Sequence, residues 1–256
     1  MEHRAGRRLL PELSALVLRH TDPGALSVVL YGSRARGSAR PDSDVDVLEV
    51  VAAKPRSYST GNMNISAYHP HALGAMAERG SLFMLHLKVD GVVLADPCGV
   101  FRGIIESYRH PASYAPLLAE VRAAATALVT TSDTDRYRPR LRRLGLYLLR
   151  TAVYATLAER GDPVFDTEQA GRRLGRAPAV EALRRRLAGV QPDDLAVLLA
   201  GISSVVGSPP ENRWGSVEAL AVAYAHTFPY ASALLAQLIA GDFHGIEYTA
   251  LSPPPL

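Results

Sequence analysis

Residues 26–51 read Leu26-Ser-Val-Val-Leu-Tyr31, then Gly32-Ser-Arg-Ala-Arg-Gly-Ser-Ala-Arg-Pro-Asp-Ser43, then Asp44-Val-Asp-Val-Leu-Glu-Val-Val51. The two outer runs are short and mostly apolar or β-branched, which is typical of buried strands. The middle segment is polar, contains glycine and has no apolar periodicity, so we expect a turn there. The stretch therefore predicts two strands, Leu26–Tyr31 and Val45–Val51, joined by a polar turn.

Two acidic residues, Asp44 and Asp46, stand two apart at the start of the second strand. Because side chains alternate along a strand, both carboxylates project from the same face. Like charges on a half-buried strand cost free energy unless cations compensate them. Mg²⁺ prefers one or two carboxylates together with phosphate oxygens. The pair therefore indicates a site for a complex of a metal ion with a nucleotide.

The turn before these acids carries groups that suit phosphate. Gly32 lets the backbone approach an anion closely, and the backbone N–H groups and the Ser33 hydroxyl can donate hydrogen bonds to it. Arg34 and Arg36 carry guanidinium groups, whose fork of donors matches the geometry of phosphate. We therefore expect these four residues to bind the nucleotide.

This combination resembles the nucleotidyltransferases of the polymerase-β superfamily, especially the small bacterial members that include antibiotic-modifying adenylyltransferases. Their motif places an Asp-x-Asp pair shortly after a Gly-Ser turn, and here ten residues separate Ser33 from Asp44. The resemblance covers residues 26–97. It implies that Gly32 and Ser33 hold the β- and γ-phosphates of an NTP, with ATP as the expected donor. It also implies that Asp44 and Asp46 are catalytic and ligate Mg²⁺, with two ions expected.

One position departs from the family's pattern. Members usually carry a third acid on a following strand, which completes the metal site and helps to deprotonate the acceptor. The corresponding strand here is Asn62–Tyr68, and the acid position falls on Asn64 or, less favoured, on Ser66. Neither side chain is a base, and a missing general base costs about 10²–10⁴-fold in rate. The sequence leaves open a slow enzyme, nucleotide binding without turnover, or a base from elsewhere, with Glu106, Asp162 and Glu168 as candidates.

Further candidates lie outside this motif. Residues 85–90 place His86, Lys88 and Asp90 on one face if they are extended, but not if they are helical. In a helix after Pro139, two arginines and two tyrosines form one stripe that is a candidate wall of the binding cleft: Arg143, Tyr147, Arg150 and Tyr154. Asp96 is a further candidate for the site. The arginines at 136–143 are candidates for an RNA contact. For all of these, packing and solvated surface are the alternative interpretation.

The chain divides into two regions of different pattern. A helix is expected from Pro11, four strands at 26–31, 45–51, 62–68 and 91–94, and a helix from Pro70 to about Gly80. Nearly everything after Phe101 has helical spacing, with helices expected around 114–129, 139–160, 166–175, 178–188, 193–206 and 215–239. We therefore predict an α/β nucleotidyltransferase domain at 1–110, with a mixed sheet and flanking helices, and an all-α domain at 111–256.

The composition favours a folded protein without a membrane span. Hydrophobic residues make up 48% and charged residues 21% of the chain, which is close to the average for globular proteins. Its longest apolar runs are far shorter than the roughly 20 residues that span a bilayer. The basic N-terminus lacks the apolar core of a secretory signal, and the single Cys98 excludes an intrachain disulfide and a zinc site built from cysteines. We expect a cytoplasmic protein.

These observations predict an Mg²⁺-dependent nucleotidyltransferase. It would transfer a nucleoside monophosphate from an NTP to a hydroxyl of an acceptor and release pyrophosphate. A small molecule is the preferred acceptor, and a protein or tRNA is the alternative. The competing hypothesis is a nucleotide-binding regulatory module of the toxin–antitoxin type with little or no turnover. The identity of the acceptor, the base of the NTP and the oligomeric state are left open.

Overall fold

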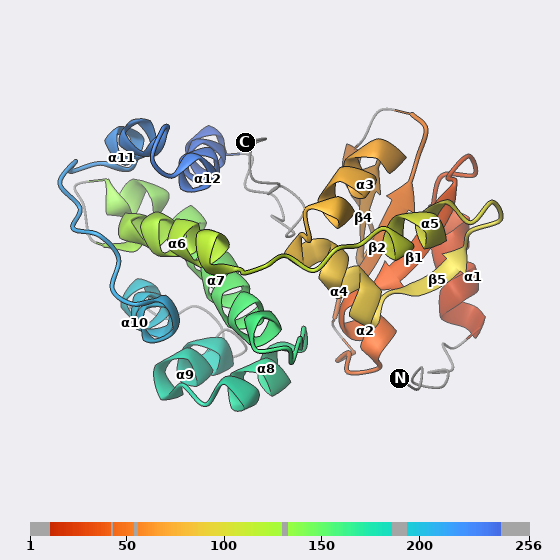
Figure 1. Cartoon of the computed structure of the whole chain (residues 1–256), viewed down its shortest axis with the longest axis horizontal. Coiled ribbons are helices and arrows are strands. Elements are labelled where there is room, and N and C mark those ends of the chain that lie inside the picture. Colours follow the sequence, from red (N-terminus) through yellow and green to blue (C-terminus); the bar gives the residue numbers. More distant parts are fainter. Residues whose placement is uncertain (1–10, 42, 54–55, 130–132, 186–193, 242–256) are drawn as a thin grey trace. The chain divides into compact units, whose positions relative to one another are not determined.

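The structure is a computed structural model that describes residues 11–41, 43–53, 56–129, 133–185 and 194–241. The chain divides into two compact units, Met1–Pro111 and Ala112–Leu256. The first unit contains a mixed sheet with flanking helices, and the described part of the second contains helices and no strand (Figure 1). The predicted fold class, an α/β region followed by a helical region, is confirmed.

The first unit is built on a five-stranded sheet in the order β3-β4-β2-β1-β5. Its strands are β1 (Ser27–Tyr31), β2 (Val45–Val50), β3 (Arg56–Thr60), β4 (Met63–Tyr68) and β5 (Val92–Ala95). The β2 and β4 strands run parallel, whereas the other three neighbouring pairs are antiparallel. Because β2 is the central strand, the Asp-x-Asp pair lies at the start of the middle strand of the sheet.

Helices cover both faces of this sheet. The α1 helix (Pro11–His20) packs Leu13, Leu16 and Val17 against a core cluster that includes Val28 and Leu30 of β1. Because residues three and four apart lie on one side of a helix, these three apolar residues form a single stripe. The opposite face of β1 meets α4 (Leu82–Asp90), and α3 (Pro70–Glu78) packs against α4 and α5 (Val100–Glu106). The short α2 helix (Gly32–Arg36) connects β1 to the turn before β2.

Three local features of this unit differ from the sequence prediction. The edge strand β3 was not predicted because its sequence, Arg-Ser-Tyr-Ser-Thr, is polar and largely exposed. The turn after β1 begins with a helix, α2, rather than with irregular structure. Residues 85–90 lie inside helix α4, so the extended alternative, which puts His86, Lys88 and Asp90 on one face, is wrong. In the helix, His86 and Asp90 are four apart and share a face, and Lys88 is exposed.

The second unit is organised around α7 (Thr134–Glu159), whose 26 residues make it the longest helix described. The other elements are α6 (Ala115–Ala124), the 3-10 helix η1 (Ala125–Leu128), α8 (Thr167–Leu174), α9 (Ala177–Arg185), α10 (Asp194–Val206), α11 (Val217–Tyr224) and α12 (Pro229–Ala240). Pro139 lies inside α7 rather than at its start, and the single helix expected at 215–239 is two helices. Pro229 begins the second of them, because proline suits the first turn of a helix.

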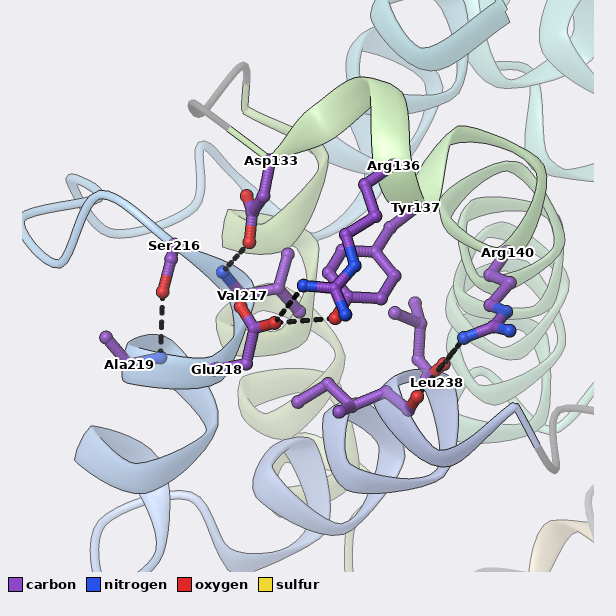
Figure 2. A network of polar contacts seen from close by, with 10 residues as sticks. Asp133, Arg136, Tyr137, Arg140, Ser216, Val217, Glu218, Ala219 and Leu238 are labelled. Carbon is purple, nitrogen blue, oxygen red and sulfur yellow. Dashed lines mark hydrogen bonds and ion pairs between the residues drawn. The ribbon is translucent and has the colours of Figure 1, made fainter.

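Side chains close to the start of α7 cap the last two helices (Figure 2). Asp133 accepts a hydrogen bond of 2.9 Å from the backbone N–H of Val217, at the start of α11. Arg140 donates two hydrogen bonds of 3.1 Å to the carbonyls of Leu238 and Ile239, at the end of α12. The free N–H groups at a helix start suit a carboxylate, and the free carbonyls at its end suit a cation. The caps therefore fix the last two helices to α7.

Two glutamates cap other helix starts in the same way. Glu120 of α6 accepts a hydrogen bond of 3.0 Å from the N–H of Ala231, in the first turn of α12. Glu159, at the end of α7, accepts from the Ser113 hydroxyl at 2.7 Å and from the Tyr114 N–H at 2.5 Å, immediately before α6. Glu120 and Glu159 thus join helices of this unit. No helix in the described part of the chain is long and apolar enough to cross a membrane.

Candidate nucleotide and metal site

The two acids of the motif lie at the start of β2. Asp44 directly precedes the strand and is exposed, whereas Asp46 is the second residue of the strand and is partly buried. One residue separates them, so their side chains leave the same face of the strand. Among the residues that the structure describes, none forms an ion pair with Asp44. This face therefore presents negative charge at the start of β2.

Strand register places four side chains in one row across the sheet. Tyr31 of β1 pairs with Asp46, Asp46 pairs with Asn64 of β4, and Asn64 pairs with Ser59 of β3. Residues that are paired across strands point to the same face. Ser66, the other candidate position for a third acid, pairs instead with Leu48, further along the strands. Asn64 is therefore the β4 residue beside the acids.

Gly32 lies directly against the carboxylate of Asp46. Its backbone has φ +73°, in the left-handed region that side chains disfavour, and a Cβ placed on it would overlap Asp46 Oδ2. The same residue begins α2 and is followed by Ser33, which is partly buried. Only glycine fits this position, because any side chain would push the carboxylate away from the turn.

Arg34 holds the turn between α2 and β2. Its Nη2 donates hydrogen bonds to the carbonyl of Pro41 at 3.1 Å and to that of Ser43 at 2.9 Å. Its Nε also donates to Ser43, at 3.3 Å. The side chain thus ties the segment that leads into Asp44. To contact phosphate, as the sequence predicts, the guanidinium would have to leave these carbonyls or use its remaining donors.

Arg36 anchors α2 to α4 through a buried ion pair. Its Nη1 lies 2.8 Å from Asp90 Oδ2 and 3.3 Å from His86 Nε2, and the Arg36 and Asp90 side chains are 13% and 11% exposed. Burial alone would raise the pKa of Asp90, but the hydrogen bonds and charges of His86 and Arg36 hold it below its ordinary value. In this structure Arg36 and His86 therefore serve the packing of α2, and Lys88 lies over the Tyr108 ring, 5.0 Å from its centroid.

Both tyrosines of the α7 stripe face the core of the helical unit, which fits the packing alternative for these two residues. Tyr147 is 2% exposed, and its hydroxyl lies 2.7 Å from that of Tyr230. Burial raises the pKa of Tyr147 to about 12. The Tyr154 hydroxyl is 2.9 Å from that of Thr167. The apolar face of such a helix packs against the core, and tyrosine side chains are apolar enough to be part of that face. Arg143 is exposed and Arg150 is partly buried.

Four of the five arginines at 136–143 are engaged within the helical unit. Arg140 caps α12, as described above, and the other three form ion pairs with acids: Arg136 with Glu218 at 3.5 Å, Arg138 with Asp135 at 2.7 Å and Arg142 with Asp194 at 2.6 Å. Figure 2 shows Arg136 and Tyr137 converging on Glu218. Four of these arginines thus have partners within the helical unit, although the Arg136 and Arg138 side chains are also exposed.

Two of the three acids proposed as substitute bases, Asp162 and Glu168, have structural partners, and so does the site candidate Asp96. Asp162 pairs with Arg173 and Glu168 with Arg172, each at 2.6 Å. Asp96 accepts hydrogen bonds from Ser27 and from backbone N–H groups at the start of α5, and these bonds hold its pKa below the ordinary value although burial alone would raise it. Within the described ranges, no three His, Cys, Asp or Glu residues lie together in a way that could hold a metal ion. The Asp44–Asp46 pair fits Mg²⁺ that takes its other ligands from phosphate and water.

Comparison with known proteins supports the motif assignment. Residues 10–73 match the family described as "Nucleotidyltransferase domain", and this stretch contains Gly32, Ser33, Asp44, Asp46 and Asn64. The predicted resemblance to nucleotidyltransferases is confirmed for this part of the chain. A nucleotidyltransferase-like protein from Exiguobacterium sibiricum 255-15 is similar in structure at 14% identity, over 76% of this chain and 71% of that chain, with a TM-score of 0.30. No match was found among curated proteins.

Proposed function

We propose that the protein is an Mg²⁺-dependent nucleotidyltransferase that moves a nucleoside monophosphate from an NTP, with ATP as the expected donor, to a hydroxyl of an acceptor. The observation that supports this most is the approach of Gly32 to Asp46, beside the exposed Asp44. It joins a turn that can hold phosphate to two carboxylates that can hold a cation, and it lies within the nucleotidyltransferase match.

Each residue of the site has a distinct part in this proposal. Ser33 and the backbone N–H groups of the turn hold the β- and γ-phosphates, and Asp44 and Asp46 hold Mg²⁺. Bound Mg²⁺ supplies neutralisation of charge on the phosphates. The acceptor oxygen forms a bond to the α-phosphorus, and the bond from the α-phosphorus to the oxygen that bridges it to the β-phosphorus breaks. Pyrophosphate leaves with that electron pair, and the hydroxyl proton passes to solvent water. Positioning and charge neutralisation dominate such transfers.

A small molecule that carries a hydroxyl is the acceptor that we propose. A tRNA acceptor would need a basic surface to contact its phosphates. Arg136, Arg138, Arg140 and Arg142 are bound to groups of the helical unit, which weakens the case for RNA.

A second function is favoured by one observation. Asn64 stands beside Asp46 where the resemblance implies an acid, so the site lacks an evident general base. A protein that binds NTP at this site and turns it over very slowly would act as a nucleotide-binding regulatory module. A measurement of pyrophosphate release, together with NTP binding, separates the two functions.

Pyrophosphate release tests the proposal. Wild-type protein is incubated with Mg²⁺ and each of ATP, CTP, GTP and UTP, with and without metabolite fractions of a cell extract. The matched control is Asp46→Asn, which reports pyrophosphate released by other components. Release above this control with one NTP and one fraction is expected. Calorimetric NTP binding without release in any fraction would support the second function, and no binding at all would overturn both.

A further inference from the structure

We propose that the site binds one divalent ion per chain together with the nucleotide, instead of the two that the resemblance implies. This inference rests on the proposed function and refines it, because it concerns the metal content of the same site. It is carried by the row that strand register makes across the sheet, in which Asn64 occupies the place beside Asp46.

The side-chain oxygen of Asn64 is turned toward β3, an outer strand of the sheet. Ser59 donates a hydrogen bond to Asn64 Oδ1 at 3.1 Å. Ser59 belongs to β3, on one side of β4, and Asp46 belongs to β2, on the other side. Of the two polar atoms of the amide, only the oxygen can ligate a cation, because the nitrogen is a donor. The NH₂ group of the Asn64 amide, which is a donor and cannot ligate a cation, therefore faces β2 and Asp46.

Charge gives a second argument against another ion at this position. Two ions in such sites lie about 3.5–4 Å apart and repel each other. Asp44 and Asp46 supply two negative charges, and Asn64 adds none. A third carboxylate in the row would both ligate the second ion and offset its charge, so its absence leaves that ion without a protein ligand on β4.

Two other acids of this unit, Glu49 and Asp90, do not take over the role. Glu49 is on the same strand, but it is an odd number of residues from both acids and points to the opposite face. There it is fully buried and accepts hydrogen bonds from the Asp22 N–H at 2.6 Å and from the Tyr58 hydroxyl at 2.8 Å. Asp90 is paired with Arg36. Within the described ranges, no three His, Cys, Asp or Glu side chains lie together as a metal site.

Manganese can stand in for magnesium and be counted by electron paramagnetic resonance. Wild-type protein is saturated with an ATP analogue that has a methylene group between the α- and β-phosphorus, and bound Mn²⁺ per chain is measured as Mn²⁺ is added. One magnetically isolated ion per chain is expected for the wild type. Asn64→Asp is expected to bind two ions, and their spectrum should show magnetic coupling because they lie close together.

The matched control is Ser57→Asp. It adds the same charge to the exposed face of β3, but in the row that pairs with Ser66, two residues away from Asn64. It is expected to bind one ion, like the wild type. A coupled pair in the wild type would overturn the inference and leave the proposed function standing. The wild-type count decides this even if Asn64→Asp does not fold.

Two further outcomes are decisive. A folded Asn64→Asp variant that still binds one ion, or a Ser57→Asp variant that binds two, would overturn the role given to Asn64. Wild-type protein that retains neither the analogue nor Mn²⁺ would overturn the proposed function itself.

Discussion

The two ends of α2 place aspartates in opposite surroundings. At its first residue, Gly32 lies against the carboxylate of Asp46, and Asp44 beside it is exposed without an ion pair in the described structure. At its last residue, Arg36 forms a nearly buried ion pair with Asp90. The five residues of α2 therefore have an acidic pair near their first residue and a neutralised acid near their last.

The difference shows how to tell a structural acid from a functional one. An acid that stabilises the fold has its donors or its counter-charge within the protein, as Asp90 does with Arg36 and His86. The two neighbouring acids Asp44 and Asp46 repel each other, which costs stability, and Asp44 has no ion pair with a residue that the structure describes. They are explained by a cation that arrives with a ligand. Removing an acid of the first kind should cost stability, and removing one of the second kind should cost function.

The largest expected effect is on turnover at the first end. Asp44→Asn and Asp46→Asn each remove a charged metal ligand, and metal ions contribute several kcal/mol of charge stabilisation. A loss of about 4 kcal/mol corresponds to a rate loss on the order of 10³-fold. Pyrophosphate release measures the rate. Without ligand, the melting temperature of Asp44→Asn should stay the same or rise, and a clear fall would break the comparison.

The second effect is on stability, at the other end of α2. Asp90→Asn leaves Arg36 without its counter-charge, and breaking a buried ion pair costs about 3–5 kcal/mol. Urea unfolding at neutral pH measures this loss. Turnover measured well below the melting temperature should fall far less than in Asp46→Asn. Equal losses of turnover in the two variants would show that the two ends of α2 do not differ as described.

The stability difference between wild type and Asp90→Asn should also depend on pH. The folded-state pKa of Asp90 lies below its ordinary value, which is about 3.9. A lowered pKa contributes stability that is complete above the unfolded-state pKa and is lost as the pH falls through the folded-state pKa. The part of the difference that Asp90 contributes should therefore shrink as the pH falls below about pH 4.

A pair of glycines separates backbone strain from contact with the acid. Gly32 and Gly37 both have φ +73°, but a Cβ on Gly37 meets nothing within 4 Å, whereas one on Gly32 overlaps Asp46. Alanine at either position costs roughly 1–2 kcal/mol for the left-handed backbone. Gly32→Ala should lose a further 1–3 kcal/mol, roughly the cost of overpacking, and weaken binding of Mg²⁺ with ATP. Calorimetry should show unchanged binding in Gly37→Ala.

The smallest effect is expected at Ser33. Ser33→Ala removes one hydrogen bond to a charged group, so NTP binding should weaken by about 1–2 kcal/mol. Binding of the free nucleoside should not change. Titration calorimetry with ATP and adenosine side by side checks this. Equal losses for both ligands would mean that Ser33 does not contact phosphate.

The parts of the fold that the sequence predicted rest on local pattern. Residues 26–51 contain two strands that their apolar runs identify, whereas the helix α2 at the start of the turn between them was not predicted. The edge strand β3 carries no such pattern, since it is polar and buries little. Its existence depends on pairing with β4, which a polar sequence does not reveal.

The parts of the site that were missed depend on partners far along the chain. Arg36 suits phosphate by type, but its partner Asp90 is 54 residues away and lies on a helix whose sequence also fits a strand. Tyr147 has a partner 83 residues away, Tyr230. The spacing of the α7 stripe was correct, but spacing alone does not tell which side of a helix meets the core. The position of Asn64 beside Asp46 could be predicted because it follows from a motif of residues that are close in sequence.

The caps of the helical unit also bear on the order in which the chain folds during synthesis. They join residues that are 84, 98 and 111 positions apart: Asp133 to Val217, Arg140 to Leu238 and Glu120 to Ala231. A ribosome adds about 5–20 residues per second, so Glu120 waits roughly 5–20 s for its partner. Every strand pair of the sheet unit lies within residues 27–95. The nucleotide site can therefore form while the helical unit is still being synthesised, and α6 and α7 need protection from aggregation until α12 emerges.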